Sequence, residues 1–233
     1  MSFDFGLIFS SLPQLLSGLA VTLKLLFLST LIGLALAIVI LLMRLSGRQW
    51  LIWPAKAYIY FLRGTPILVQ IFLIYYGLPQ FDAVRDSVFW PLLRQPFFCC
   101  MVALALNTSA YVSEILRGGV MGVDKGVYEA AKALGLTARQ RFIYVISPIA
   151  IRIALPAYGN EIISMMKATA LASTVTLLDV TGVARTIVAD TFAPFEIFIA
   201  AAIIYLVMAW LFQLGFGIIE ERIGRYMKRE ASS

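Results

Sequence analysis

Long apolar runs separated by shorter polar segments set the pattern of this chain. A helix needs about twenty predominantly apolar residues to cross the roughly 30 Å hydrocarbon core of a bilayer. The apolar runs therefore predict membrane-spanning helices rather than the half-buried helices of a soluble domain. Five spans are predicted, at about residues 19–43, 58–78, 97–116, 158–180 and 195–219. The fourth is the least apolar, because it contains Glu161, Lys167 and several hydroxyl side chains.

The composition agrees with a membrane protein. Hydrophobic residues make up 61% of the chain and charged residues 14%, whereas about a quarter of the residues in soluble domains are charged. We therefore expect one all-α integral membrane domain over residues 1–233. The net charge of +6 does not indicate nucleic-acid binding, because the basic residues lie in loops between apolar runs. The chain has no histidine, the commonest general base and metal ligand, and we predict neither a catalytic residue nor a metal site.

The distribution of basic residues predicts the orientation of the chain. Clusters lie at 44–56, 117–152 and 222–229, whereas the loops on the opposite side contain Arg85, Arg94 and Arg185. Cytoplasmic loops carry the excess of Lys and Arg in membrane proteins. The N-terminus is therefore predicted to lie outside and the C-terminus in the cytoplasm, in agreement with an odd number of spans.

The loop at residues 117–156 carries strong local signals for helices. Asp124 is a candidate N-cap for a helix over residues 127–134, and Gly135 stands where a left-handed residue ends such a helix. Thr137 and Gln140 form a capping box for a second helix. The pattern predicts a helix–glycine–helix element at the cytoplasmic surface. It is compatible with a docking element for a soluble partner and with an interfacial hairpin that only joins two spans.

The second arm of this loop contains two prolines. Pro148 is expected to interrupt the second helix, and Pro156 is expected to precede the fourth span.

The residues of the loop also carry a resemblance. Glu129-Ala130-Ala131, Gly135 and the later run Val145-Ile146-Ser147-Pro148 resemble the signature loop of bacterial ABC importer permeases, although serine replaces the usual leucine at 147. The resemblance implies that the loop docks on a separate ATPase subunit. Small side chains at Ala130 and Ala131 would then allow close approach, Glu129 would meet a basic groove, and Gly135 would let the next helix fold back.

The resemblance extends over most of the chain. The segments LLSGLAVTLKL, FLRGTPILVQIFLIYYGLP, ALNTSAYVSEILRGGV and LPAYGNEIISMMKATAL resemble the polar amino-acid branch of these permeases, and most closely the M-type subunit of histidine, basic amino-acid and opine importers. This implies the type I ABC importer permease fold in a bacterial inner membrane. It also implies an ABC ATPase dimer, a second permease subunit (a related Q-type chain or a second copy) and a periplasmic solute-binding protein as partners. The chain lacks a phosphate-binding loop, so no cofactor is expected on it and ATP with Mg belongs to the ATPase.

Ionisable residues within spans are costly and point to functional sites. Arg63-Gly64-Thr65-Pro66 interrupts the second span. Thr65 is expected to cap and Pro66 to begin a half-helix, whose N-terminus would suit the α-carboxylate of a substrate. The alternative is a proline kink with Arg63 at the cytoplasmic interface.

A second group of candidates lies in the third and fourth spans. Glu114 and Glu161 are expected toward the cytoplasmic side, facing each other. Asn160, Ser164 and Lys167 share one helical face, with Glu161 on the neighbouring face. Glu161 and Lys167 either recognise the charged ends of an amino acid or hold the fourth span against a partner subunit. Acidic groups near the path favour a cationic substrate, as does the resemblance, which points to histidine, arginine, lysine or opines.

The leading hypothesis is thus the permease subunit of an ATP-driven importer of polar, in particular basic, amino acids or their derivatives. A self-sufficient secondary transporter or channel is the alternative, but five spans without an internal repeat do not match the usual transporter plan. A membrane enzyme is a third possibility, and the absence of histidine disfavours it.

Overall fold

The computed structural model describes residues 4–230, with side chains up to residue 223, and this part of the chain consists of helices and short connections. The α-helices are α1 (Phe5–Leu45), α2 (Gln49–Gly64), α3 (Ile67–Phe72), α4 (Asp82–Arg85), α5 (Trp90–Leu93), α6 (Pro96–Met121), α7 (Lys125–Ala133), α8 (Ala138–Gln140), α9 (Ser147–Ala168), α10 (Val180–Thr191) and α11 (Pro194–Glu230). π-Helical segments follow α3 (Leu73–Gly77) and α8 (Arg141–Ile146). 3₁₀ turns cover Leu78–Gln80 and Thr169–Val175.

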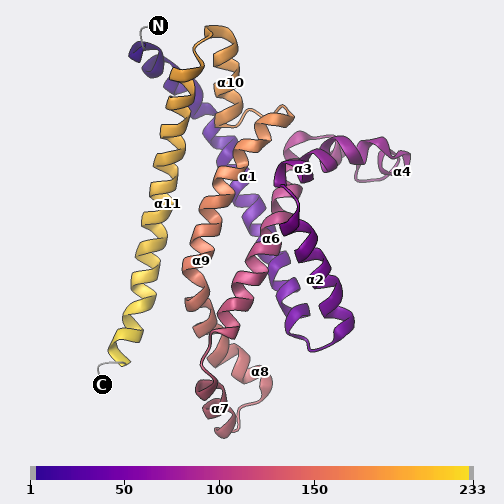
Figure 1. Ribbon diagram of the computed structural model, residues 1–233, viewed down its shortest axis with the longest axis vertical. Helices are drawn as coiled ribbons and strands as arrows, with labels where there is room; N and C mark the ends of the chain where they lie inside the picture. The colour runs from indigo at the N-terminus through magenta and orange to yellow at the C-terminus, as the bar shows by residue number, and fades with distance from the viewer. Residues whose placement is uncertain (1–3, 231–233) are drawn as a thin grey trace.

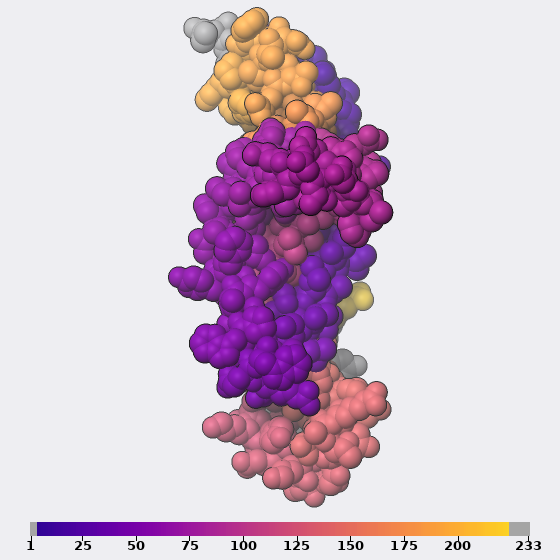
Figure 2. Space-filling view, turned by 90° about the vertical axis from the view of Figure 1, so that its right-hand side faces the viewer, coloured from indigo at the N-terminus to yellow at the C-terminus, as the bar shows by residue number. Residues whose placement is uncertain are grey.

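Four helical stretches are long and apolar enough to cross a membrane, namely Phe5–Leu45, Pro96–Met121, Ala138–Val175 and Pro194–Ile223. A fifth span exists if Gln49–Gly64 and Ile67–Gln80, bent by 105° at their junction, count as one. In Figure 1, α1, α6, α9 and α11 run along the long axis, while α3 and α4 project to one side. Figure 2 shows the face covered by α2 and the α3–α5 segment, with part of α6 recessed between them.

The first helix is longer than the apolar run predicts. It begins at Phe5 rather than near residue 19. Asp4 caps it, because the Asp4 carboxylate accepts a hydrogen bond from the Leu7 amide at 3.1 Å. The polar residues before residue 19 thus belong to the same helix, and the start of the apolar run does not mark the start of the helix.

The two prolines of the fourth span do not act as expected. The helical path is continuous from Ala138 to Val175, so Pro148 does not interrupt it and Pro156 lies inside α9. A π-helical segment precedes α9, and in a π-helix each amide donates to the carbonyl five residues earlier. Proline has no amide hydrogen, so Pro148 leaves the Ile143 carbonyl without a backbone donor. The Ser147 hydroxyl donates to that carbonyl at 3.0 Å. Serine at 147, the departure from the signature, therefore has a structural role here.

Two glycines allow the long helices to cross closely. A Cβ added at Gly33 of α1 would collide with the Thr108 side chain of α6, and one added at Gly119 of α6 would collide with the Ala150 carbonyl of α9. These contacts keep α6 packed between α1 and α9. Because α6 also contacts α2 and α3, its polar residues lie near both the second and the fourth spans.

Gly119→Ala is expected to lower stability by about 1–3 kcal/mol, because overpacking a close contact costs that much. Gly118→Ala is the matched control, since a Cβ at Gly118 meets nothing within 4 Å and alanine favours the helix. Thermal unfolding of the detergent-solubilised protein measures both. Equal melting temperatures for the two variants would contradict this account of the α6–α9 crossing.

The two ends of the molecule differ in what they carry. The start of α1 lies with α10 at one end, and α7, α8 and the end of α11 lie at the other (Figure 1). At the α10 end the fully buried Asp179 caps α10 through the Gly182 amide at 3.0 Å and accepts from the Tyr205 hydroxyl at 3.0 Å. Burial raises the pKa of the Asp179 carboxyl, and these hydrogen bonds oppose the increase.

The membrane orientation of the two ends remains a prediction. Among the basic residues of the tail, Arg222 is exposed. The side chains of Arg225, Lys228 and Arg229 lie outside the described residues.

Candidate functional site

The loop between α6 and α9 folds as its local signals predict. The Asp124 carboxylate caps α7 by accepting from the Gly126 amide at 2.7 Å. The helix ends at Ala133, and Gly135 follows in the left-handed conformation with φ +74°. The capping box of Thr137 and Gln140 is present. The loop is shorter than the predicted range of residues 117–156, because α6 continues to Met121 and α9 begins at Ser147.

The exposed surface of this loop differs from the predicted one at one position. Glu129, Ala130 and Gly135 are exposed, whereas Ala131 is only 4% exposed. Ala131 packs within the loop and does not offer its side chain to a partner. Leu134, which the sequence interpretation did not select, is 80% exposed at the tip.

Arg141 ties the two arms of the loop together. Its guanidinium lies 5.1 Å from the centroid of the Tyr128 ring and donates to the Leu136 carbonyl at 2.7 Å. The loop is thus internally braced, so that a force on α7 would reach α9 through the π-helical segment between them.

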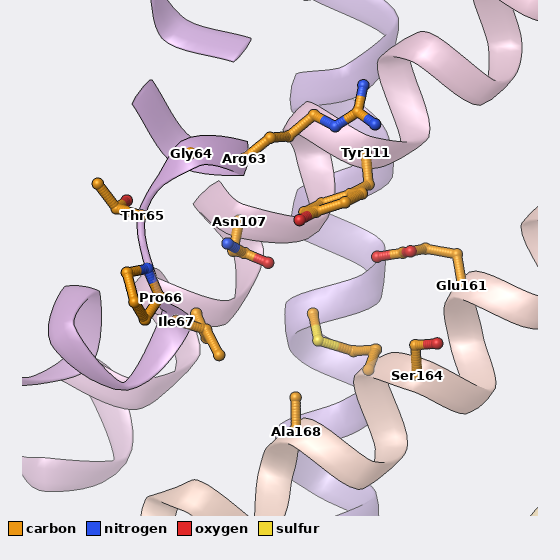
Figure 3. A pocket seen from close by; sticks show the side chains of 11 residues that line it. Arg63, Gly64, Thr65, Pro66, Ile67, Asn107, Tyr111, Glu161, Ser164 and Ala168 are labelled. Atoms are coloured by element: carbon orange, nitrogen blue, oxygen red, sulfur yellow. The ribbon is translucent and has the colours of Figure 1, made fainter. Parts of the chain in front are cut away.

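A polar cavity of about 510 Å³ lies where α2 and α3 meet, opposite α9. Figure 3 shows Glu161 directed from α9 toward Tyr111, with Arg63 reaching over the tyrosine ring. The lining residues are Arg63, Gly64, Thr65, Pro66, Ile67, Asn107, Tyr111, Glu161, Ser164, Met165 and Ala168. Four of the predicted path residues, Arg63, Thr65, Glu161 and Ser164, thus meet in one cavity.

The break between α2 and α3 is held by two amide side chains. The buried Gln70 donates from Nε2 to the carbonyl of Leu62 at 2.8 Å and to Oγ1 of Thr65 at 2.8 Å. Asn107 of α6 donates from Nδ2 to Oε1 of Gln70 at 3.1 Å. These bonds satisfy backbone groups that the break frees, and such groups must find partners within the protein at membrane depth.

Thr65 does not cap the half-helix that follows it. Its hydroxyl donates to the Phe61 carbonyl at 2.9 Å, at the end of α2. Pro66 is the N-cap residue of α3, and no side chain caps the first turn. The second span is therefore two helices rather than one kinked helix.

Glu161 is the acidic side chain of this cavity. Its Oε1 atom accepts a hydrogen bond from the Thr108 hydroxyl of α6 at 3.1 Å. Glu161, Ser164 and Ala168 follow the helical spacing of one face of α9, and that face lines the cavity. Asn160 and Lys167 are exposed and do not line it, so Ser164 is the member of the predicted face of Asn160, Ser164 and Lys167 that borders the cavity.

Glu114 lies apart from Glu161, contrary to the expectation that the two carboxylates face each other. Its Oε2 atom accepts two hydrogen bonds from Arg117, at 2.9 and 2.7 Å, and Arg44 lies 3.5 Å from Oε1. Glu114 lines a second cavity of about 460 Å³, together with Arg44, Lys56, Ile59, Tyr60, Arg63, Gly64 and Tyr111. The spacing of residues along each helix did not predict that the two carboxylates line different cavities.

Four residues that shape the first cavity were not predicted from the sequence: Gln70, Asn107, Thr108 and Tyr111. A signal was present, because Gln70 interrupts an apolar run and Asn107-Thr108-Ser109 forms a polar cluster within the third span. Polar residues inside a span need partners, and the four residues make these contacts between helices.

Comparisons with known proteins place the chain in one class. The octopine transport system permease protein of Rhizobium meliloti is 46% identical over 220 residues, covering 94% of this chain and 90% of its own length. The nopaline transport system permease protein of Agrobacterium fabrum is 48% identical over 209 residues, covering 89% and 87%. The histidine/lysine/arginine/ornithine permease protein of Escherichia coli is 38% identical over 213 residues, covering 91% and 90%.

Solved structures agree with this class. The crystal structure of an amino acid ABC transporter with histidines contains a chain with TM-score 0.86 and 40% identity, covering 95% of this chain and 100% of that chain. The inward-facing methionine ABC transporter MetNI matches with TM-score 0.67 over 94% of this chain and 99% of its own, but its 14% identity supports the fold alone.

The predicted fold class, the type I ABC importer permease, is thereby confirmed. The prediction of a transport subunit rather than an enzyme is confirmed as well. The family described as "binding-protein-dependent transport system inner membrane component" matches residues 29–225, and this chain belongs to it.

Proposed function

We propose that this chain is the permease subunit of an ATP-driven importer of amino acids or opines that carry a cationic side chain, in a bacterial inner membrane. The observation that carries this proposal is the Glu161 carboxylate, which lines a polar cavity at a helix break and, among the described residues, accepts one side-chain hydrogen bond, from Thr108. An intramembrane carboxylate without a cation within 4 Å is expensive. A cationic group of the substrate would serve as the counter-ion of the Glu161 carboxylate.

The other end of an amino acid also finds suitable chemistry in this cavity. The first turn of the helical segment Ile67–Gln80 borders the cavity, and no side chain caps it. Free amides and the helix dipole favour an α-carboxylate at such a place. The proposed pose therefore spans the cavity from the break at Pro66 to Glu161 (Figure 3).

Lys167 takes the second of its two predicted roles in this proposal. It is exposed, lies outside the cavity and has no ion pair among the described residues. We assign Lys167 and Asn160 to the contact with a second permease subunit, either a related chain or a second copy, and Glu161 to the substrate.

The loop that carries α7 is proposed to receive the ATPase. Its exposed surface is formed by Glu129, Ala130, Leu134 and Gly135, while Ala131 fixes the helix to its own loop. ATP and Mg would bind the ATPase dimer, and a periplasmic binding protein would deliver the substrate at the opposite end. The N-terminus and α10 would then face the periplasm.

Reconstitution tests the proposal. Vesicles containing the complete transporter are supplied with binding protein loaded with arginine, octopine, histidine or glutamine, and ATP hydrolysis and uptake are measured. Arginine or octopine should stimulate both activities more than glutamine. Uptake that persists without nucleotide would favour the secondary transporter or channel, and preferential uptake of glutamine would contradict the role of Glu161.

A further inference from the structure

The two polar cavities share three lining residues, Arg63, Gly64 and Tyr111. Along α6, Asn107 belongs to the first cavity, Tyr111 to both and Glu114 to the second. α6 continues from Glu114 toward Met121 and α7, so the second cavity lies nearer the end that carries α7 (Figure 1). The pair Arg63–Tyr111 therefore stands between the proposed substrate cavity and a second chamber on the side of the ATPase loop.

Arg63 is weakly held in this position. Its guanidinium lies 4.9 Å from the centroid of the Tyr111 ring. Among residues 4–223, whose side chains the structure describes, the guanidinium makes neither a hydrogen bond nor an ion pair within 4 Å. A cation–π contact at a solvent-accessible site is a small restraint, so the side chain can leave the ring when the balance of charge around it changes.

Two carboxylates set that balance. Arg63 lines the first cavity together with Glu161 and the second cavity together with Glu114. Arg44 and Arg117 already neutralise Glu114, whereas Glu161 has a neutral hydroxyl partner. Arg63 is the basic residue among those that line the first cavity, so in the absence of substrate it is the cation that faces the Glu161 carboxylate there.

We propose that Arg63 and Tyr111 form a charge-sensing latch between the two cavities, an inference that rests on the proposed cationic substrate. A cationic group bound at Glu161 takes over the role of counter-ion and repels the guanidinium. Arg63 then leaves the Tyr111 ring toward the second cavity, and the barrier between the cavities opens. The neighbouring Gly64 leaves room for this movement, since a Cβ there would meet nothing within 4 Å.

Leak through the assembled transporter tests the latch. Vesicles containing the complete complex are preloaded with labelled arginine, and efflux is followed without ATP. Arg63→Gln and Tyr111→Leu should each raise this efflux about two- to fivefold, the range that corresponds to loss of one cation–π contact at an exposed site. Arg48→Gln is the matched control, because Arg48 is an exposed residue at the start of α2, outside both cavities. It should leave the efflux at the parent level.

Further variants keep the test decisive. Tyr111→Phe should leak less than Tyr111→Leu, because it retains the ring face. If Arg63→Gln does not co-purify with its partners, Arg63→Lys tests the same contact, since lysine keeps the charge without the planar guanidinium.

The latch and the proposed function fail in different ways. Parent-level efflux in both Arg63→Gln and Tyr111→Leu, with arginine uptake lost in Glu161→Gln, would overturn the latch and leave the proposed function standing. Full arginine uptake by Glu161→Gln would overturn the proposed function and with it the sensing of charge.

Discussion

Glu161→Gln is expected to lower ATP-driven uptake of arginine about a hundredfold. Truncating one partner of a buried, hydrogen-bonded charge pair typically costs about 2–5 kcal/mol, and each 1.4 kcal/mol is a factor of ten. The amide retains the shape of the side chain and can still bond to the Thr108 hydroxyl, which lies 3.1 Å from Oε1. The loss should therefore fall on the substrate and not on the fold, and uptake at several arginine concentrations measures it.

Two controls separate charge from position in this experiment. Arg48→Gln removes an exposed charge that lines neither polar cavity, and uptake should remain within about twofold of the parent, the usual scale of surface substitutions. Glu161→Asp keeps the charge and should retain more uptake than Glu161→Gln. If the amide and the shorter acid are equally impaired, the length of the side chain matters and a charge-recognition role for Glu161 is wrong.

The parts of this structure that the sequence predicts are those that local chemistry decides. Apolar length identifies the spanning helices, since no tertiary contact is needed to exclude polar residues from a bilayer core. Asp124, Gly135 and the Thr137–Gln140 capping box fix the helix–glycine–helix loop through bonds within a few residues. The first helix of the loop, predicted over residues 127–134, is observed at Lys125–Ala133, whereas α1 begins at Phe5 and not near residue 19.

The arrangement of the cavities depends on contacts between distant residues. The 105° break after Gly64 is stabilised by Gln70 and by Asn107 of another helix, whereas the local pattern also allowed a single kinked helix. Glu114 and Glu161 occupy different cavities because Arg117, Arg44 and Thr108 select their positions. Periodicity along one helix reveals a face, but it does not reveal which helix covers that face.

The local sequence also did not predict the surroundings of one proline and one alanine. Pro156 was expected to mark a helix boundary, yet it lies inside α9. Ala131 was expected at a partner's surface, yet the loop buries it. In both positions the residue type is compatible with two environments, and packing decides between them.

Leu134→Asp is expected to abolish ATP-driven uptake by separating the permease from its ATPase. Leu134 is 80% exposed at the tip of the loop, where burial in a groove of the partner would contribute about 1.5–3 kcal/mol, and an aspartate there would also carry an unpaired charge into that groove. Glu129→Lys should act in the same direction by reversing the charge offered to a basic groove. Co-purification of the ATPase with the solubilised permease and uptake in vesicles measure both effects.

The exposure of Leu134 makes this a test of docking rather than of folding. A side chain that contacts little of its own chain contributes little to stability, so Leu134→Asp should melt within a degree or two of the parent, as exposed substitutions usually do. Leu134→Met should restore ATPase binding, because it conserves volume and apolar character. If both Leu134→Asp and Glu129→Lys keep the ATPase and full uptake, the α7 loop is an interfacial hairpin that only joins two spans, and the motor must engage the permease elsewhere.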